Sequence, residues 1–245
     1  MATEIALVVI ALLLGGIVKA TLGFGAPLIA LPILALGLGG EDAVVLMAVP
    51  GVVANGILSH STRSHRPETV DLWRIVIPSI PAAAVGALIL SGLPDRGISA
   101  LLAGMLIAYL VVRRLRPDAS VSRRTRLWLS PAVGTAGGLS QGAVGISLPL
   151  VGPYLHTLRL TPDAFTHQVC TFFLVPTVIQ MVTLAVVGEY DARRVGLSLL
   201  ATAVLLTTLP IGMRLRRSMS PAGFEAAVLW MMGLAALLLL LEAVL

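Results

Sequence analysis

The sequence predicts an all-α, polytopic membrane protein built from two inverted repeats. Three observations lead to this prediction: the apolar content of the chain, a set of glycine and proline positions that recurs halfway along it, and the distribution of arginine between its apolar segments. Of the 245 residues, 57% are hydrophobic and 12% are charged, whereas soluble domains carry roughly 25% charged residues. The apolar runs are therefore expected to cross a lipid bilayer, where a spanning helix needs about 20 residues.

The excess of basic residues indicates membrane topology and not nucleic-acid binding. The net charge of +5 comes mainly from arginines in short segments between apolar runs, where basic residues orient a membrane protein. The single cysteine, Cys170, excludes a disulfide framework or a cysteine metal site. The four histidines are scattered and no His-Glu-x-x-His motif occurs, so neither a metal nor a cofactor is expected.

Polar breaks divide the chain into eight apolar segments. They cover residues 4–38, 43–60, 73–91, 97–112, 128–155, 168–187, 195–213 and 221–244. The longest polar break, 113–126, carries six arginines and bisects the chain. We therefore expect an N-terminal repeat over 1–112, a basic cytoplasmic linker over 113–126 and a C-terminal repeat over 127–245.

Glycine and proline positions recur between the two halves. Three pairs lie 122 positions apart, namely Gly16 with Gly138, Gly23 with Gly145 and Pro27 with Pro149. Further pairs follow in the same order, at an offset of 126 for Pro50 with Pro176 and Gly86 with Gly212, and of 120 for Asp71 and Arg74 with Asp191 and Arg194. Single matches are common in membrane helices, but several in one order indicate an internal duplication.

The arginines orient the two halves oppositely. Short loops rich in Lys and Arg lie on the cytoplasmic side, so the linker is predicted inside. Counting crossings from the linker then places 61–71 inside and 41–42 outside in the first half. In the second half, 214–217 and Arg159 are predicted inside and 188–194 outside. The repeats are therefore inverted, both termini are predicted outside, and the expected location is the inner membrane.

Segments 4–38 and 128–155 each begin and end on one side of the membrane. They are therefore expected to fold back at their Gly/Pro clusters. At 1.5 Å per residue, about 17 residues per arm are too few for two comfortable crossings, so we expect two broken or re-entrant hairpins and six full spans. Inverted repeats with such interrupted segments at matching positions are typical of secondary transporters.

The two clusters predict an anion site at the start of two opposed helices. The candidate residues are Gly23, Phe24, Gly25 and Pro27 in the first half, and Gly145, Ile146, Ser147 and Pro149 in the second. Irregular backbone inside lipid persists only where it is buried in protein or lines a cavity, and amides at a helix N-terminus attract anions. The alternative is that the glycines only permit close helix packing, as the spacing of Gly134, Gly138 and Gly142 indicates.

Four polar side chains within apolar segments complete the candidate substrate site. Lys19 is the only lysine, and an ionisable group at membrane depth marks a functional site by default; the alternative is that it reaches toward an interface. Its counterpart in the second half is the neutral Gln141. Asn55 and Gln180 either donate to a substrate or bond across helices.

Other polar residues are less informative. His167, Gln168 and Thr171 are expected at the start of a helix, as caps or at the cavity entrance. The stretch Gly138-Leu139-Ser140-Gln141-Gly142 matches G-x-S-x-G, but that motif needs a preceding strand with a His and an acid nearby. Because it lies in a predicted membrane helix, an intramembrane serine hydrolase is the least favoured function.

The stretches from Gly16 to Pro32 and from Gly138 to Pro153 resemble the hallmark of the TauE/SafE family of sulfite and organosulfonate exporters. That hallmark is a run of small residues leading into G-[FIL]-G, with a proline a few residues later, once per half. Ser147 departs from it, because a second glycine is common there. The resemblance implies a role for Gly23, Phe24, Gly25 and Pro27, and for Gly145, Ile146 and Pro149 in the second half.

The resemblance further implies a transporter of small anions, such as sulfur oxyanions or organic sulfonates. We therefore expect a secondary transporter, with a passive anion channel as the alternative, whose partners are a small anion and the lipid bilayer. The coupling ion, H⁺ or Na⁺, and a homo-oligomer are left open.

Overall fold

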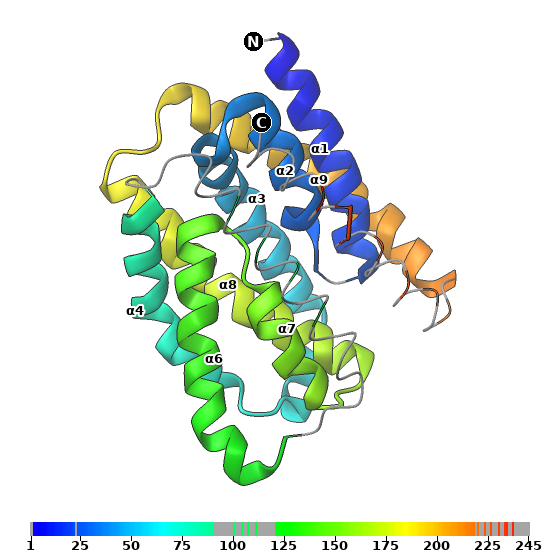
Figure 1. Ribbon diagram of the computed structural model, residues 1–245. Helices are drawn as coiled ribbons and strands as arrows, with labels where there is room; N and C mark the ends of the chain where they lie inside the picture. The colour runs from blue at the N-terminus through cyan, green and yellow to red at the C-terminus, as the bar shows by residue number, and fades with distance from the viewer. Residues whose placement is uncertain are drawn as a thin grey trace.

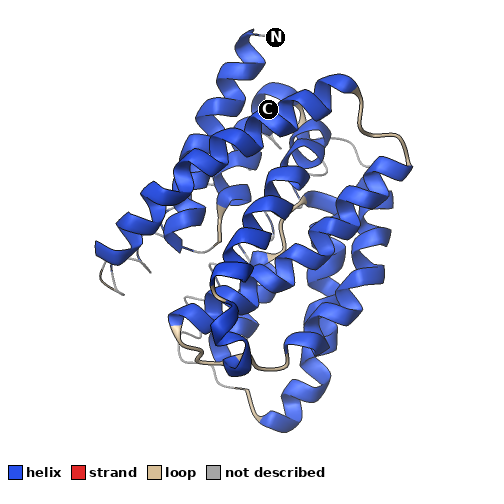
Figure 2. Cartoon of the chain, turned by 180° about the vertical axis from the view of Figure 1, so that it is seen from behind, coloured by secondary structure: helices blue, strands red, loops and turns tan. Residues whose placement is uncertain are grey.

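The computed structural model is helical throughout the part of the chain it describes, which is residues 2–22, 24–90 and 121–218 with isolated positions at 100–111 and 220–237. Figure 2 shows helices and loops and no strand among these residues. The elements are α1 (Ala2–Leu22), α2 (Ala26–Leu38), α3 (Gly40–Ser61), the 3₁₀ helix η1 (Arg63–Glu68), α4 (Leu72–Leu90), α6 (Arg123–Val144), α7 (Leu148–Thr157), α8 (Pro162–Val186) and α9 (Ala192–Ser218).

Five of these helices, α1, α3, α4, α8 and α9, are long and apolar enough to cross a membrane. Four of them are predicted full spans. The other two predicted spans, 97–112 and 221–244, lie outside the residues described continuously. The fifth helix, α1, is the first arm of a predicted hairpin. The estimate of about 17 residues per arm was wrong, because each hairpin has a long first arm and a short second arm. The first arms have 21 and 22 residues, and the second arms 13 and 10.

Two helices begin earlier than their apolar runs. The α6 helix starts at Arg123, within the segment expected as a linker, after Ser122 accepts a capping hydrogen bond from the Thr125 amide at 3.2 Å. The α8 helix starts at Pro162, because Thr161 caps it and proline suits the first helical position. Polar residues at a helix start are common caps, so both starts precede the first apolar residue.

The early start of α8 corrects the expectation for three polar residues. His167, Gln168 and Thr171 lie inside the helix and bind the N-terminal half. His167 Nδ1 lies 3.0 Å from the Ser59 carbonyl, and the Thr171 hydroxyl lies 2.7 Å from that of Ser59. Gln168 binds the backbone of Val70. These residues join the two halves and do not cap a helix.

The first helix of each half packs against a helix of the other half (Figure 1): α1 runs along α9, and α6 runs along α4. Glycines permit this close approach. A Cβ atom on Gly138 would lie 2.4 Å from the Ser79 carbonyl oxygen, and one on Gly142 would lie 2.1 Å from that of Ala83. Gly138 and Gly142 therefore bring α6 close to α4, as their spacing predicts.

The two interfaces use corresponding residues. A Cβ atom on Gly86 of α4 would meet the Leu139 oxygen, the Ala143 nitrogen and the Gly142 Cα at 2.2, 2.8 and 3.0 Å. A Cβ atom on Gly212 of α9 would meet Ile17, Thr21 and Ala20 at 2.7, 2.9 and 2.3 Å. Residues 17, 20 and 21 lie 122 positions before residues 139, 142 and 143, so both glycines contact the same three positions of the first helix.

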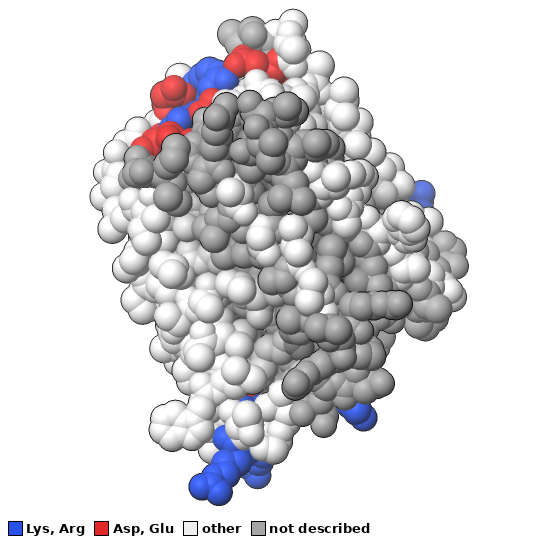
Figure 3. Space-filling model, viewed as in Figure 1, with Lys and Arg blue, Asp and Glu red and all other residues white. Residues whose placement is uncertain are grey.

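Charged residues gather at the two ends of the helices. Figure 3 shows acidic and basic residues together at the end that carries the N-terminus, and basic residues at the opposite end. At the first end, Arg193 and Arg194 of α9 pair with Glu4 and Asp42. Burial of Tyr190 beside them raises the pKa of its hydroxyl to about 12.

At the opposite end the ion pairs of arginine are longer. Arg126 lies 3.6 Å and Arg74 3.9 Å from Asp71. Hydrogen bonds from Thr161 and His65 hold the pKa of Glu68 below its ordinary value. Among the described residues, Glu4, Asp42 and Arg193 therefore lie at one end, and Glu68, Asp71 and Arg126 at the other.

Candidate functional site

The first helix break separates α1 from α2 at the predicted Gly/Pro cluster. Gly25 precedes α2 with φ 102° and ψ −3°, a left-handed conformation that glycine adopts without strain. The Leu28 amide donates to the Gly25 oxygen at 3.1 Å, and Pro27 has no amide hydrogen. The Ala26 amide has no acceptor among the described residues, so it remains available at the start of α2. Gly23 lies outside the described residues.

The second break separates α6 from α7 in the corresponding place. Here the left-handed residue is Gly145, with φ 70°, and its amide donates to the Gln141 oxygen at 2.9 Å. Ser147 precedes α7 with φ −128°, which any residue adopts, so the serine that departs from the family pattern fits without strain. The Leu148 amide at the start of α7 has no acceptor in the described part of the chain.

The Ser140 hydroxyl has a structural partner in this break. It donates to the Ile146 carbonyl oxygen within the loop. Ser140 is 3% exposed and lies in α6, and no strand occurs among the residues that the structure describes. This position differs from the exposed turn on which a hydrolase nucleophile sits.

Lys19 is buried inside the fold and does not reach an interface. Its side chain is 3% exposed, and Nζ donates to Asn55 Oδ1 at 2.7 Å. The contact joins α1 to α3 across 36 residues of sequence. The interpretation in which Lys19 extends to the membrane surface is therefore wrong.

A cavity lies between the two breaks and the middle of α3 and α8. It encloses about 590 Å³ of space not filled by protein atoms, part of it open to solvent. Nine of the twelve predicted site residues line it: Lys19, Gly25, Pro27, Asn55, Gln141, Gly145, Ile146, Ser147 and Gln180. Phe24 and Pro149 are not part of the lining; Phe24 packs edge-on against Phe165, with ring centroids 6.1 Å apart.

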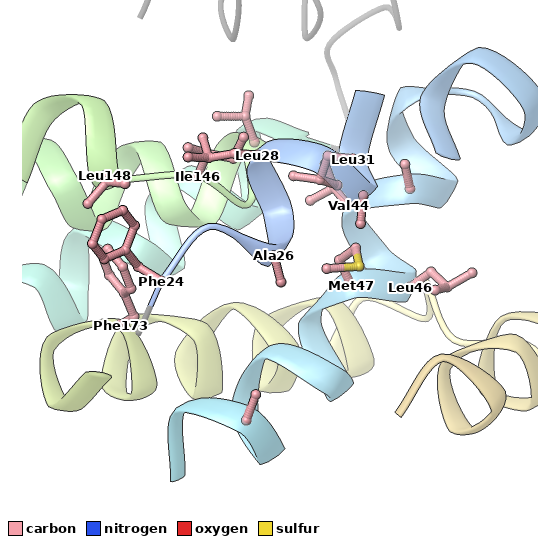
Figure 4. Close-up of a cluster of buried hydrophobic side chains, with 14 of the residues drawn as sticks. Phe24, Ala26, Leu28, Leu31, Val44, Leu46, Met47, Ile146, Leu148 and Phe173 are labelled. Atoms are coloured by element: carbon pink, nitrogen blue, oxygen red, sulfur yellow. The ribbon is translucent and has the colours of Figure 1, made fainter. Parts of the chain in front are cut away.

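Apolar side chains from both breaks form one cluster beside this cavity. Figure 4 shows Leu28 of α2 and Ile146 of the second break among its labelled side chains, together with Val44 and Met47 of α3. A Cβ atom on Gly145 would lie 3.4 Å from Leu31 and 3.5 Å from a methyl group of Val44. The two breaks are thus held together by apolar contacts that leave their polar groups facing the cavity.

The amide side chains of the lining differ in how many donors they keep. Gln141 accepts a hydrogen bond from Ser147 through Oε1 at 3.1 Å, and its Nε2 has no acceptor among the described residues. Asn55 accepts from Lys19 and likewise keeps Nδ2. Gln180 donates from Nε2 to the Gly142 oxygen at 3.0 Å, so one of its two hydrogens holds α8 to α6.

Sequence reasoning missed several lining residues, including Met47, Gly51, Phe173, Thr177 and Leu205. Two of them were detectable from the repeat. Gly51 and Thr177 lie 126 positions apart, each directly after the matched proline, and a Cβ atom on Gly51 would lie 3.3 Å from Thr177 Cγ2. The two corresponding positions therefore meet in the middle of the fold.

The donor groups around the cavity outnumber the charges. Lys19 is the only ionisable side chain among the lining residues. The other polar groups are side-chain amides, hydroxyls and the helix-start amides of Ala26 and Leu148. Such a set suits the oxygens of an anion, because ammonium, amide and helix N-terminal groups all donate hydrogen bonds.

Comparison with known proteins agrees with this arrangement. The family model described as "Sulfite exporter TauE/SafE" matches residues 7–239, nearly the whole chain. No curated protein and no solved structure matches the chain. The family match covers both helix breaks and every residue of the cavity lining, so the chain belongs to the TauE/SafE sulfite exporter family.

Proposed function

We propose that the chain is a secondary transporter that binds a small anion, a sulfur oxyanion or an organic sulfonate, between its two helix breaks near the membrane midplane. The observation that carries this proposal is the convergence of Lys19, two helix-start amides and two amide side chains on one cavity. Family membership supports transport of a sulfur compound. What we propose beyond family membership is the class of anion and its binding between the two helix breaks.

In this proposal the anion bridges the two halves. The Lys19 side chain provides the charge, and Asn55 and Gln141 donate through their remaining N–H groups. The amides of Ala26 and Leu148 bind further oxygens, where the dipoles of α2 and α7 favour negative charge. Because these two amides belong to the backbone, they need little reorganisation to bind the anion.

The second part of the proposal is that residues 1–112 and 127–245 form inverted repeats joined by the segment 113–126. The equivalent contacts of Gly86 and Gly212 support it, because each glycine meets the same three positions of the partner half. The grouping of loops at two ends also supports it. Rocking of one repeat against the other would expose the cavity to each side in turn.

Flux into proteoliposomes tests the transport proposal. Radiolabelled sulfite, methanesulfonate and sulfoacetate are offered in turn to vesicles carrying the intact chain or a Lys19→Gln variant. We expect uptake of at least one anion by the intact chain and its near loss in the variant. The proposal would be overturned if none of the anions crossed the membrane and none raised the melting temperature.

The same vesicles separate a transporter from a passive anion channel. A secondary transporter accumulates the anion against its gradient when a proton or sodium gradient is imposed, whereas a channel only equilibrates it. Flux that never exceeds equilibrium and shows single-channel conductance would favour the channel.

A reporter fused to the C-terminus tests the inverted topology. The arginine pattern predicts that both termini are outside, so a reporter active only in the periplasm should be active. A cytoplasmic C-terminus would contradict the inverted repeats.

A further inference from the structure

A network of ion pairs ties the two halves together at the end that carries the N-terminus. Asp42, in the first turn of α3, accepts from both arginines of α9: from Arg193 Nη1 at 2.7 Å and from Arg194 Nε at 2.8 Å. Arg194 also donates to Glu41 at 2.7 Å. The charged network consists of Glu4, Glu41, Asp42, Glu189, Arg193 and Arg194. It joins α1 and α3 of the first half to α9 of the second.

The charged network lies at one end of the cavity. Asp42 precedes the lining residues Val44 and Met47 on α3, by about 3 Å and 7.5 Å along the helix at 1.5 Å per residue. Asp42 and Arg194 are 17% and 18% exposed, so water screens their attraction only in part. The charged network therefore bridges the two halves at this end of the cavity.

A neutral contact occupies the corresponding place at the opposite end. Gln168 of α8 donates from Nε2 to the Val70 oxygen at 2.8 Å and accepts from the Val70 amide at 2.9 Å. Gln168 lies 126 positions after Asp42, the offset of Pro50 and Pro176 on the same two helices. Val70 precedes Arg74, the counterpart of Arg194, by four residues. Both contacts therefore join corresponding positions of α3 or α8 to the segment that begins α9 or α4.

The geometry points to these two contacts as the gates of the cavity. One gate is Asp42 with Arg193 and Arg194, at the end that carries Glu4, which we call the Glu4 face. The other gate is Gln168 with Val70, on the opposite face. This inference rests on the proposed transport function, in which one face opens while the other stays closed. The gates differ in chemistry. Salt weakens the attraction between charges, so it should loosen the Glu4-face gate more than the opposite gate, whose own hydrogen bonds are neutral.

Side-specific cysteine labelling tests the inference without any substrate. Ala48→Cys, in a Cys170→Ala background, places a thiol in the cavity lining below the charged network. A membrane-impermeant maleimide reaches the Glu4 face in intact cells and the opposite face in inside-out vesicles, given the predicted topology. Asp42→Asn and Arg194→Gln should each raise labelling from the Glu4 face roughly tenfold, as expected for loss of a hydrogen bond between charged groups.

The matched controls lie at the opposite end. Arg74→Gln makes the same change at the counterpart of Arg194, where the ion pair is 3.9 Å long, and should leave labelling from the Glu4 face unchanged. Gln168→Leu removes both hydrogen bonds to Val70 and should raise labelling from the opposite face alone.

Several results would overturn the gates. Labelling that stays unchanged in both network variants would do so, as would equal increases from both faces, which indicate general loosening. If neither variant folds, the protein with an intact charged network is labelled at increasing salt concentration. Labelling from the Glu4 face must then rise with salt, and labelling that does not depend on salt rejects the inference. Side-specific labelling without flux of any anion would count against the transport function alone, whereas flux with unchanged labelling would count against the gates alone.

Discussion

The two helix breaks occupy corresponding positions in the two halves, yet they turn the chain differently. Among the described residues of the first break, the left-handed one is Gly25, directly before α2. In the second it is Gly145, directly after α6, while Ser147, the counterpart of Gly25, has φ −128°. Both breaks nevertheless start the next helix at matching positions, Ala26 and Leu148. The difference teaches that the helix start is held in register although the residue directly before it is left-handed in one break and not in the other.

The side chains around the breaks differ further. The first half brings Lys19 to the cavity and the second brings Gln141, so only one half contributes a charge. Helix breaks at matching sequence positions of the two halves thus enclose a site whose side chains do not match. An anion held there would contact an amine from one half and an amide from the other.

The strongest test of this asymmetry removes the charge. Lys19→Gln makes the two halves alike and should weaken anion binding by about 10- to 100-fold, the range expected when a charged hydrogen bond is lost. Gln141→Ala, the matched change in the second half, should cost roughly tenfold at most, because a neutral donor is lost. Equilibrium binding of the anion identified by flux measures both. Equal losses in the two variants would show that the charge does not distinguish the halves.

A second test compares the two glycine contacts between the halves. Gly86→Ala and Gly212→Ala each place a Cβ atom against a neighbouring helix, and overpacking of this kind costs about 1–3 kcal/mol. Both variants should therefore melt at a lower temperature in detergent. Gly196→Ala, on the open side of α9 with nothing within 4 Å, serves as the control and should melt no lower than the intact chain. A drop in only one of the two would break the correspondence between the interfaces.

The smallest effect is expected at the breaks themselves. Gly25→Ala forces a side chain into a left-handed conformation and should cost about 1–2 kcal/mol of unfolding free energy. Ser147→Ala leaves φ acceptable and removes only the hydrogen bond to Gln141, worth about 1 kcal/mol or less. Denaturation in detergent compares the two. If Ser147→Ala proved the more damaging, the turn geometry would not be what distinguishes the breaks.

The positions of the breaks and the existence of the helices were predictable, because their signals are local. Gly23 to Pro27 and Gly145 to Pro149 combine residues that end one helix and start another, and the repeat marks both. The start of α8 was missed although its signal was also local. Thr161 and Pro162 are a capping residue and a first helical residue, but the apolar run begins six residues later. Boundaries drawn from apolar runs alone therefore omit a polar first turn.

The partners of the site residues were not predictable, because they depend on tertiary packing. Lys19 meets Asn55 only because the fold brings the end of α1 and the middle of α3 together at a specific rotation of each helix. Nothing in either segment specifies that rotation. Likewise, sequence alone does not show that Gln180 donates one N–H hydrogen to the Gly142 oxygen. Gln180 therefore has fewer donors left for substrate than Asn55.

The packing of α1 against α9 has a consequence for how the chain is made. The α1 helix leaves the ribosome about 170 residues before α9 begins, which takes roughly 10–35 s at 5–20 residues per second. During that interval the face of α1 around Gly16, which Thr208 of α9 covers in the finished protein, has no partner. The insertion machinery or the surrounding lipid must shield it. The first helix of each half is covered by a helix of the other half. The contact that buries this face of α1 therefore forms only after α9 has been made.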